Sequence, residues 1–92
     1  MKLHIFIWVC LLAALQSVMA VNPIKEGNMI SGHVIEKGTE VNIPYATILI
    51  VGTDMGTVSN EEGQFQFRNL KEGKYTLRVS AVGYKTQTKE VL

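Results

Sequence analysis

Apolar and polar side chains alternate along residues 75–82, the longest regular pattern in the chain. Tyr75, Leu77 and Val79 fall on one side of this alternation, and polar residues fall on the other. A period of two places the apolar members on one face of a β-strand. The pattern therefore predicts a strand with one buried and one hydrated face, which Gly83 ends.

Shorter patterns of the same kind predict the other strands. Residues 64–67 place Phe65 and Phe67 together on a core-facing side. Residues 45–51 are apolar on both faces, which predicts a central or doubly covered strand that opens after Pro44. Further strands are expected at 29–36, 57–59 and 86–92, the last as a polar edge strand.

Glycines separate these patterns at intervals that suit tight turns. Gly63 follows Asn60, Glu61 and Glu62, and we expect it to adopt a positive φ that a side chain would resist. With about seven strands and no helical period, the domain is predicted to be all-β, an immunoglobulin-like or related β-sandwich. The structural turn and core positions are predicted to be Gly52, Gly56, Gly63, Phe65, Phe67, Gly73, Tyr75, Leu77, Gly83 and Tyr84.

The first 20 residues follow a different pattern. Lys2 precedes an apolar run from Ile5 to Leu15, and the segment ends Ser17-Val18-Met19-Ala20 with compact residues where a signal peptidase reads them. This order is typical of a helical secretory signal peptide. The apolar run of 11 residues is shorter than the roughly 20 that a membrane span needs. Cys10 lies inside the run and not at its end, which argues against a lipoprotein signal.

The chain is thus expected to consist of a signal peptide at 1–20, a flexible lead-in at 21–28 and a β-sandwich domain at 29–92. The lead-in contains Pro23 and has no apolar periodicity. Loss of Lys2 with the signal lowers nine basic residues to eight against eight acidic ones, so the exported chain has zero formal charge and no transmembrane segment is expected in it. This balance gives no electrostatic reason to expect nucleic acid or an anionic membrane as a partner.

Several short motifs, taken in order, resemble a known domain family. They are Ile43-Pro44-Tyr45-Ala46-Thr47, Gly52-Thr53, Gly56-Thr57, Gly63-Gln64-Phe65, Gly73-Lys74-Tyr75-Thr76-Leu77 and Gly83-Tyr84-Lys85-Thr86. From Ile30 to Leu92 the chain resembles the carboxypeptidase regulatory-like domain, a transthyretin-like β-sandwich. More narrowly, it is similar to the copy that follows the signal peptide of many TonB-dependent outer-membrane receptors. Asn60 stands where the family often has aspartate, which keeps the turn and drops a charge.

The resemblance implies a non-catalytic accessory module in the periplasm or at the periplasmic face of the outer membrane. It implies uptake of large solutes such as iron chelates, cobalamin or glycans, powered through TonB. The implied partners are the plug and barrel of such a receptor, or periplasmic energy-coupling proteins. Because the sequence ends at Leu92, we expect an amino-terminal fragment of a receptor or a free-standing module. Two alternatives stay open: a secreted carbohydrate-binding or adhesion module, and an accessory domain of a metallocarboxypeptidase.

Residue types that carry chemistry are sparse in the predicted domain. His33 is its one histidine and no cysteine accompanies it, so neither a metal site nor a cofactor is expected. Asp54, Glu61 and Glu62 lie in neighbouring turns without the alternating ligand pattern of a calcium loop. The charged residues are therefore interpreted as solvated turns.

Two serines and three tyrosines are the remaining candidates. Ser59 and Ser80 have no histidine nearby in sequence to activate them, so catalysis is not expected. Tyr45 is a candidate platform for a sugar or a protein partner. Tyr75 and Tyr84 are expected to pack against the core or cap its ends.

Overall fold

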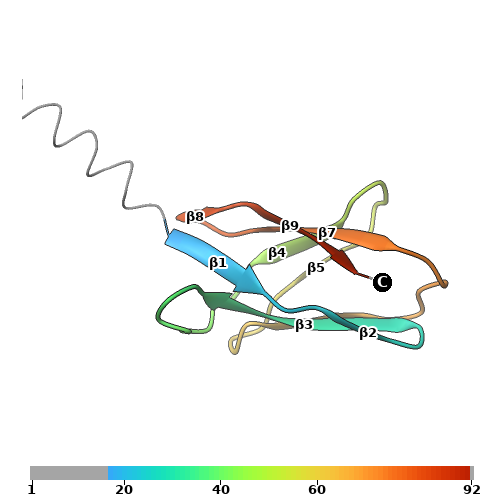
Figure 1. Cartoon of the computed structure of the whole chain (residues 1–92), viewed down its shortest axis with the longest axis horizontal. Helices are drawn as coiled ribbons and strands as arrows, with labels where there is room; N and C mark the ends of the chain where they lie inside the picture. Colours follow the sequence, from blue (N-terminus) through green and yellow to red (C-terminus); the bar gives the residue numbers. More distant parts are fainter. Residues whose placement is uncertain (1–16, 92) are drawn as a thin grey trace, which may run out of the picture.

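The computed structural model describes residues 17–91, and the secondary structure of this part of the chain consists of strands without a helix (Figure 1). The strands are β1 (Ser17–Val21), β2 (Ile24–Glu26), β3 (Met29–Glu36), β4 (Thr47–Ile50), β5 (Gly56–Val58), β6 (Gln64–Phe67), β7 (Tyr75–Ser80), β8 (Tyr84–Lys85) and β9 (Gln87–Val91). The predicted all-β sandwich is confirmed, with nine strands in place of seven. Within residues 17–91, no helix has the length and apolar character needed to cross a bilayer.

The strands form two sheets that face each other as layers (Figure 1). One sheet has the order β2-β3-β1-β8, and β6 also pairs with β3. In this sheet β3 is the hub, because β1, β2 and β6 all pair with it in antiparallel fashion. The other sheet has the order β5-β4-β7-β9 and is antiparallel throughout.

The core lies between the layers and follows the alternation of the strands. In β6 and β7, every second side chain is buried, which puts Phe65, Phe67, Leu77 and Val79 inside. Burial of these side chains is the main favourable term in the folding of such a domain. The whole core consists of Met19, Val21, Ile30, Val34, Ile43, Ala46, Ile48, Ile50, Phe65, Phe67, Leu70, Leu77, Val79 and Val91.

β4 is central in its sheet but is covered on one face alone. It pairs with β5 on one side and β7 on the other, whereas Thr47 and Val51 are exposed to solvent. Of the two predicted alternatives, the central strand is confirmed and the doubly covered strand is wrong. The strand also begins later than predicted, because Pro44 and Tyr45 form a turn in which Tyr45 has a φ of 58°.

The expected flexible lead-in is wrong as well. Val21 is the last residue of β1 and is buried, and β2 pairs with the beginning of β3 across a turn at Gly27, whose φ is 59°. Pairing with β3 gives these short segments the hydrogen-bond partners that their own sequence does not imply. Met19, inside the predicted signal peptide, is 3% exposed. Residues 1–16 lie outside the described residues, and the signal peptide stays a prediction.

Candidate functional site

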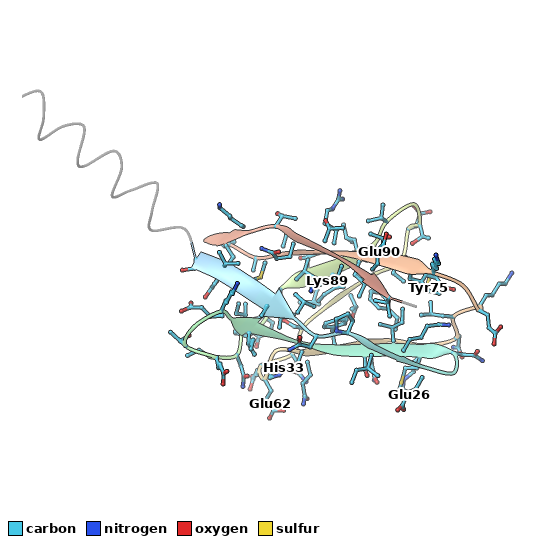
Figure 2. All side chains as sticks on the ribbon, in the orientation of Figure 1. Glu26, His33, Glu62, Tyr75, Lys89 and Glu90 are labelled. Atoms are coloured by element: carbon cyan, nitrogen blue, oxygen red, sulfur yellow. The ribbon has the colours of Figure 1, made fainter. Side chains whose placement is uncertain are left out.

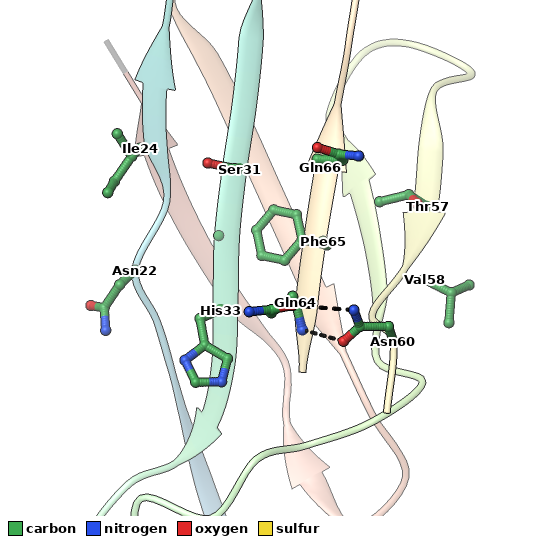
Figure 3. Close-up of a pocket in the computed structure, with 11 residues that line it drawn as sticks. Asn22, Ile24, Ser31, His33, Thr57, Val58, Asn60, Gln64, Phe65 and Gln66 are labelled. Atoms are coloured by element: carbon green, nitrogen blue, oxygen red, sulfur yellow. Dashed lines mark hydrogen bonds between the residues drawn. The ribbon is translucent and has the colours of Figure 1, made fainter. Parts of the chain in front are cut away.

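A groove of about 560 Å³ follows the outer face of β3 and β6 (Figure 3). Ser31 and His33 face outward on β3 because they alternate with core positions, and Gln64 and Gln66 do the same on β6. The register sets His33 opposite Gln64 and Ser31 opposite Gln66. The other lining residues are Asn22, Ile24, Gly32, Thr57, Val58, Asn60 and Phe65.

The groove offers hydrogen-bonding groups and almost no charge. Its polar side chains are amides and hydroxyls, with His33 as the one titratable residue among the lining positions. Nε2 of His33 lies 2.7 Å from Oδ1 of Asn42 and 2.8 Å from the carbonyl oxygen of Glu62. Both partners accept, so Nε2 is assigned a proton. This arrangement suits an uncharged polar ligand and ties β3 to two loops.

Asn60 organises the turn at one end of the groove. Its Oδ1 accepts hydrogen bonds from the backbone N–H groups of Glu62 and Gln64, each at 2.9 Å. Its Nδ2 donates to Oε1 of Gln64 at 3.3 Å (Figure 3). An aspartate could accept the first two bonds but could not donate the third. Asparagine therefore keeps the turn and also fixes a side chain that lines the groove.

Gly63, in the same turn, meets two requirements at once. Its φ of 78° is the left-handed conformation expected from its place after Glu62. A Cβ here would lie 2.5 Å from the carbonyl oxygen of Val34. The turn packs this closely because the backbone N–H of Val34 donates to the carbonyl oxygen of Gly63 at 2.8 Å.

Ser59 is a structural residue that the sequence did not reveal as such. It is 1% exposed, its Oγ donates to the carbonyl oxygen of Ile43 at 2.9 Å, and it accepts from the backbone N–H of Ala46 at 2.8 Å. The hydroxyl thus satisfies two backbone groups of the segment that leads into β4. Its proton is used within the fold, and a buried hydroxyl of this kind has no path to a substrate.

A second hollow, of about 310 Å³, lies at one end of the sandwich. Tyr45 and Val82 stand at its rim, 65% and 101% exposed. The hydroxyl of Tyr45 donates to Oε1 of Glu61 at 3.5 Å. The other lining residues are Asn42, Ile43, Pro44, Ala81 and Tyr84. Tyr45 is thus exposed, and its role as a contact platform stays a prediction.

Tyr84 lies at the same end of the sandwich and connects two strands of one sheet. Its hydroxyl donates to Oε2 of Glu36 at 2.6 Å, which joins β8 to the last residue of β3. This hydrogen bond raises the pKa of Tyr84 above its ordinary 10.0, and desolvation and the negative charge of Glu36 act in the same direction.

The predicted turn and core positions are distributed as follows. The apolar residues Phe65, Phe67 and Leu77 are in the core, and Tyr75 and Tyr84 pack half-buried against it. Positive φ values occur at Gly52, Gly63, Gly73 and Gly83. Gly56 begins β5 and faces Leu49, whose Cδ2 would be 2.7 Å from an added Cβ.

The ionisable residues do not converge on the groove. Figure 2 shows His33 and Glu62 on the layer of β3, whereas Lys89 and Glu90 lie on β9 in the other layer. Among residues 17–91, no group of three or more His, Cys, Asp or Glu side chains is arranged to hold a metal ion. Asp54, Glu61 and Glu62, the acidic residues of the neighbouring turns, are among the residues to which this finding applies.

The comparison with protein families gives one match. Residues 30–92, which include β4 to β9 and nearly all of β3, match the CarboxypepD_reg-like domain family. The chain belongs to the carboxypeptidase regulatory-like domain family. The regulatory-like match thus begins after β1 and β2, two of the strands that the sequence did not predict. A search of curated proteins and a search of solved structures each found no match.

Proposed function

We propose that this regulatory-like domain is a non-catalytic accessory module that works in the periplasm as the amino-terminal part of a TonB-dependent outer-membrane receptor for nutrient uptake. The observation that carries the proposal is the order of the chain, in which a predicted secretory signal is followed almost at once by the family match at 30–92. In this role the domain is a spacer or a docking surface beside the plug of the receptor.

The non-catalytic part of the proposal is supported by how the candidate side chains are used. The hydroxyl of Ser59 satisfies two backbone groups, and Nε2 of His33 faces two acceptors within the protein. A nucleophile needs a general base within hydrogen-bond reach, whereas both partners of the Ser59 hydroxyl are backbone groups. Both side chains instead hold loops in place.

The docking part is supported by the hollow around Tyr45. An exposed tyrosine beside the fully exposed Val82 gives a contact surface with an apolar body and a polar rim. Tyrosine is enriched at protein interfaces because its ring buries a large area and its hydroxyl finds a hydrogen bond. Cross-linking from position 45 is therefore expected to capture a periplasmic or outer-membrane protein.

Two measurements test this proposal. Reading the gene beyond codon 92 is expected to show a plug and a barrel in the same frame. Fractionation of cells that carry the tagged native gene is expected to place the product in the outer membrane, with a cytoplasmic protein as the control. A stop codon directly after codon 92, or a product retained in the cytoplasm, would contradict the proposal.

A second function, binding of a neutral glycan, is favoured by the groove on β3 and β6. Its lining amides and hydroxyls match the hydrogen-bonding capacity of sugar hydroxyls. Binding on a glycan array that is lost with Gln64→Ala and Gln66→Ala would support it. Tyr45→Ala is the matched comparison, because Tyr45 lines the other hollow. Loss of glycan binding with Tyr45→Ala alone would instead assign the glycan site to the hollow that Tyr45 lines.

A further inference from the structure

The last four residues of the predicted signal peptide are part of the folded sandwich. Met19 pairs with Glu36 and Ala20 with Ile35 on the antiparallel side of β1, while Ser17 pairs with Tyr84 and Val18 with Lys85 on the parallel side. β1 thus lies between β3 and β8 of one sheet (Figure 1). The segment therefore joins β3 to β8 within this sheet.

This strand contributes both hydrogen bonds and core. The backbone N–H of Lys37 donates to the carbonyl oxygen of Val18 at 2.8 Å. Met19 is 3% exposed and belongs to the core cluster, and Val21 beside it is 2% exposed. Removal of Ser17–Ala20 would leave backbone groups of β3 and β8 without partners, and an apolar space where the Met19 side chain lies.

The vacated position would differ from an ordinary sheet edge. A segment added at an edge forms hydrogen bonds on one side, whereas a segment between β3 and β8 forms them on both. The resident strand defines what fits: an extended backbone, antiparallel to β3, with an uncharged apolar side chain at the Met19 position. The neighbouring Val18 and Ala20 are half-buried, which admits small or branched side chains there.

We propose that the position of Ser17–Ala20 is an exchangeable strand site, which takes an extended segment of a partner polypeptide after the signal peptide is cut behind Ala20. This inference rests on the proposed export and on cleavage at that bond. While the precursor is intact, its own leader fills the site. After cleavage, the partner segment completes the sheet and places its apolar residue in the space left by Met19.

The test begins with the product of the full-length gene, expressed in an exporting bacterium and purified from the periplasm. Mass spectrometry is expected to give Val21 as its first residue. The probe is a synthetic peptide, Leu15-Gln16-Ser17-Val18-Met19-Ala20, and the control is the same peptide with Met19→Asp. At a hundredfold excess over Kd, the probe is expected to raise the Tm by about 10 °C or more, and the control is expected to leave it unchanged. If the processed chain is unfolded alone, the probe should restore its β-sheet circular dichroism.

The other outcomes are separable. A periplasmic product that begins at Ser17 or earlier would overturn the exchangeable site and leave export standing. A product that begins at Val21, stays monomeric and does not bind the probe peptide would also overturn the exchangeable site. A dimer that the probe does not dissociate would assign the position to a second copy of the chain. Failure to reach the periplasm would contradict both export and this inference.

Discussion

The ring of Phe65 lies directly against the backbone of Gly32. A Cβ added at Gly32 would lie 2.3 Å from Cζ and 2.6 Å from Cε1 of the ring. The register of β3 and β6 sets these two residues opposite each other on the core-facing side. The φ of Gly32 is not in the left-handed region, so the backbone conformation does not require glycine here. Glycine is required because the ring of Phe65 occupies the space of a Cβ.

Gly32→Ala is expected to lower the free energy of unfolding by about 1–3 kcal/mol, the usual cost of forcing extra atoms into a packed core. Denaturant unfolding measures this change. Ser31→Ala, on the outer face of the same strand, is the control and should alter stability little. In the double variant Gly32→Ala/Phe65→Leu, the smaller side chain should make the loss less than the sum of the two single losses. Strict additivity would show that ring and glycine are not in contact.

Ser59→Ala is expected to cost at least about 1–3 kcal/mol, because it leaves the backbone N–H of Ala46 and the carbonyl of Ile43 without a buried partner. Thermal unfolding of this variant beside Ser80→Ala tests the point, since Ser80 is half-buried at the end of β7. Equal Tm values for the two variants would contradict the structural role assigned to Ser59.

Asn60→Asp and Asn60→Ala should differ in their effects. Aspartate keeps both acceptor bonds to the turn and loses the donor bond to Gln64, so a loss of less than about 1 kcal/mol is expected. Alanine loses all three bonds, and the loss should exceed that of aspartate by about 1 kcal/mol or more. Urea midpoints give the order, and an alanine variant as stable as the aspartate variant would contradict the assigned turn.

The bond between Tyr84 and Glu36 predicts a dependence of stability on alkaline pH. Because the folded state raises the pKa of Tyr84 above 10.0, the contribution is fully present below about pH 10 and is lost as the pH rises through the raised value. The stability difference between the native chain and Tyr84→Phe should therefore be constant near about pH 8 and should shrink near about pH 11. Glu36→Gln keeps an acceptor and removes the charge, so it should weaken this dependence. A difference that does not change with pH would contradict the bond.

Much of the sandwich could be predicted because its strands bury alternate side chains. The pattern in 75–82 identified Leu77 and Val79, and Phe65 and Phe67 follow from the same rule in β6. Leu70 lies outside these alternating patterns but is also buried, and its N–H donates to the carbonyl oxygen of Asn28 at 2.9 Å.

The missed strands β1, β2 and β8 all depend on a distant partner. β1 has the composition of a cleavage segment, and its role as a strand comes from pairing with β3 and β8. β2 has three residues, too few for a period, and exists because Gly27 turns it onto β3. The groove was missed for the same reason: Gln64 and Gln66 face outward, and the register alone brings His33 and Ser31 beside them.

The central claim is that this domain is a non-catalytic module. It is tested most directly by a peptidase assay on the exported chain against a panel of peptides, with zinc and with a chelator. We predict turnover no higher than that of the His33→Ala and Ser59→Ala variants, with or without the metal. Turnover that is lost on chelation, or that falls in either variant, would contradict the assignment of these side chains to structure.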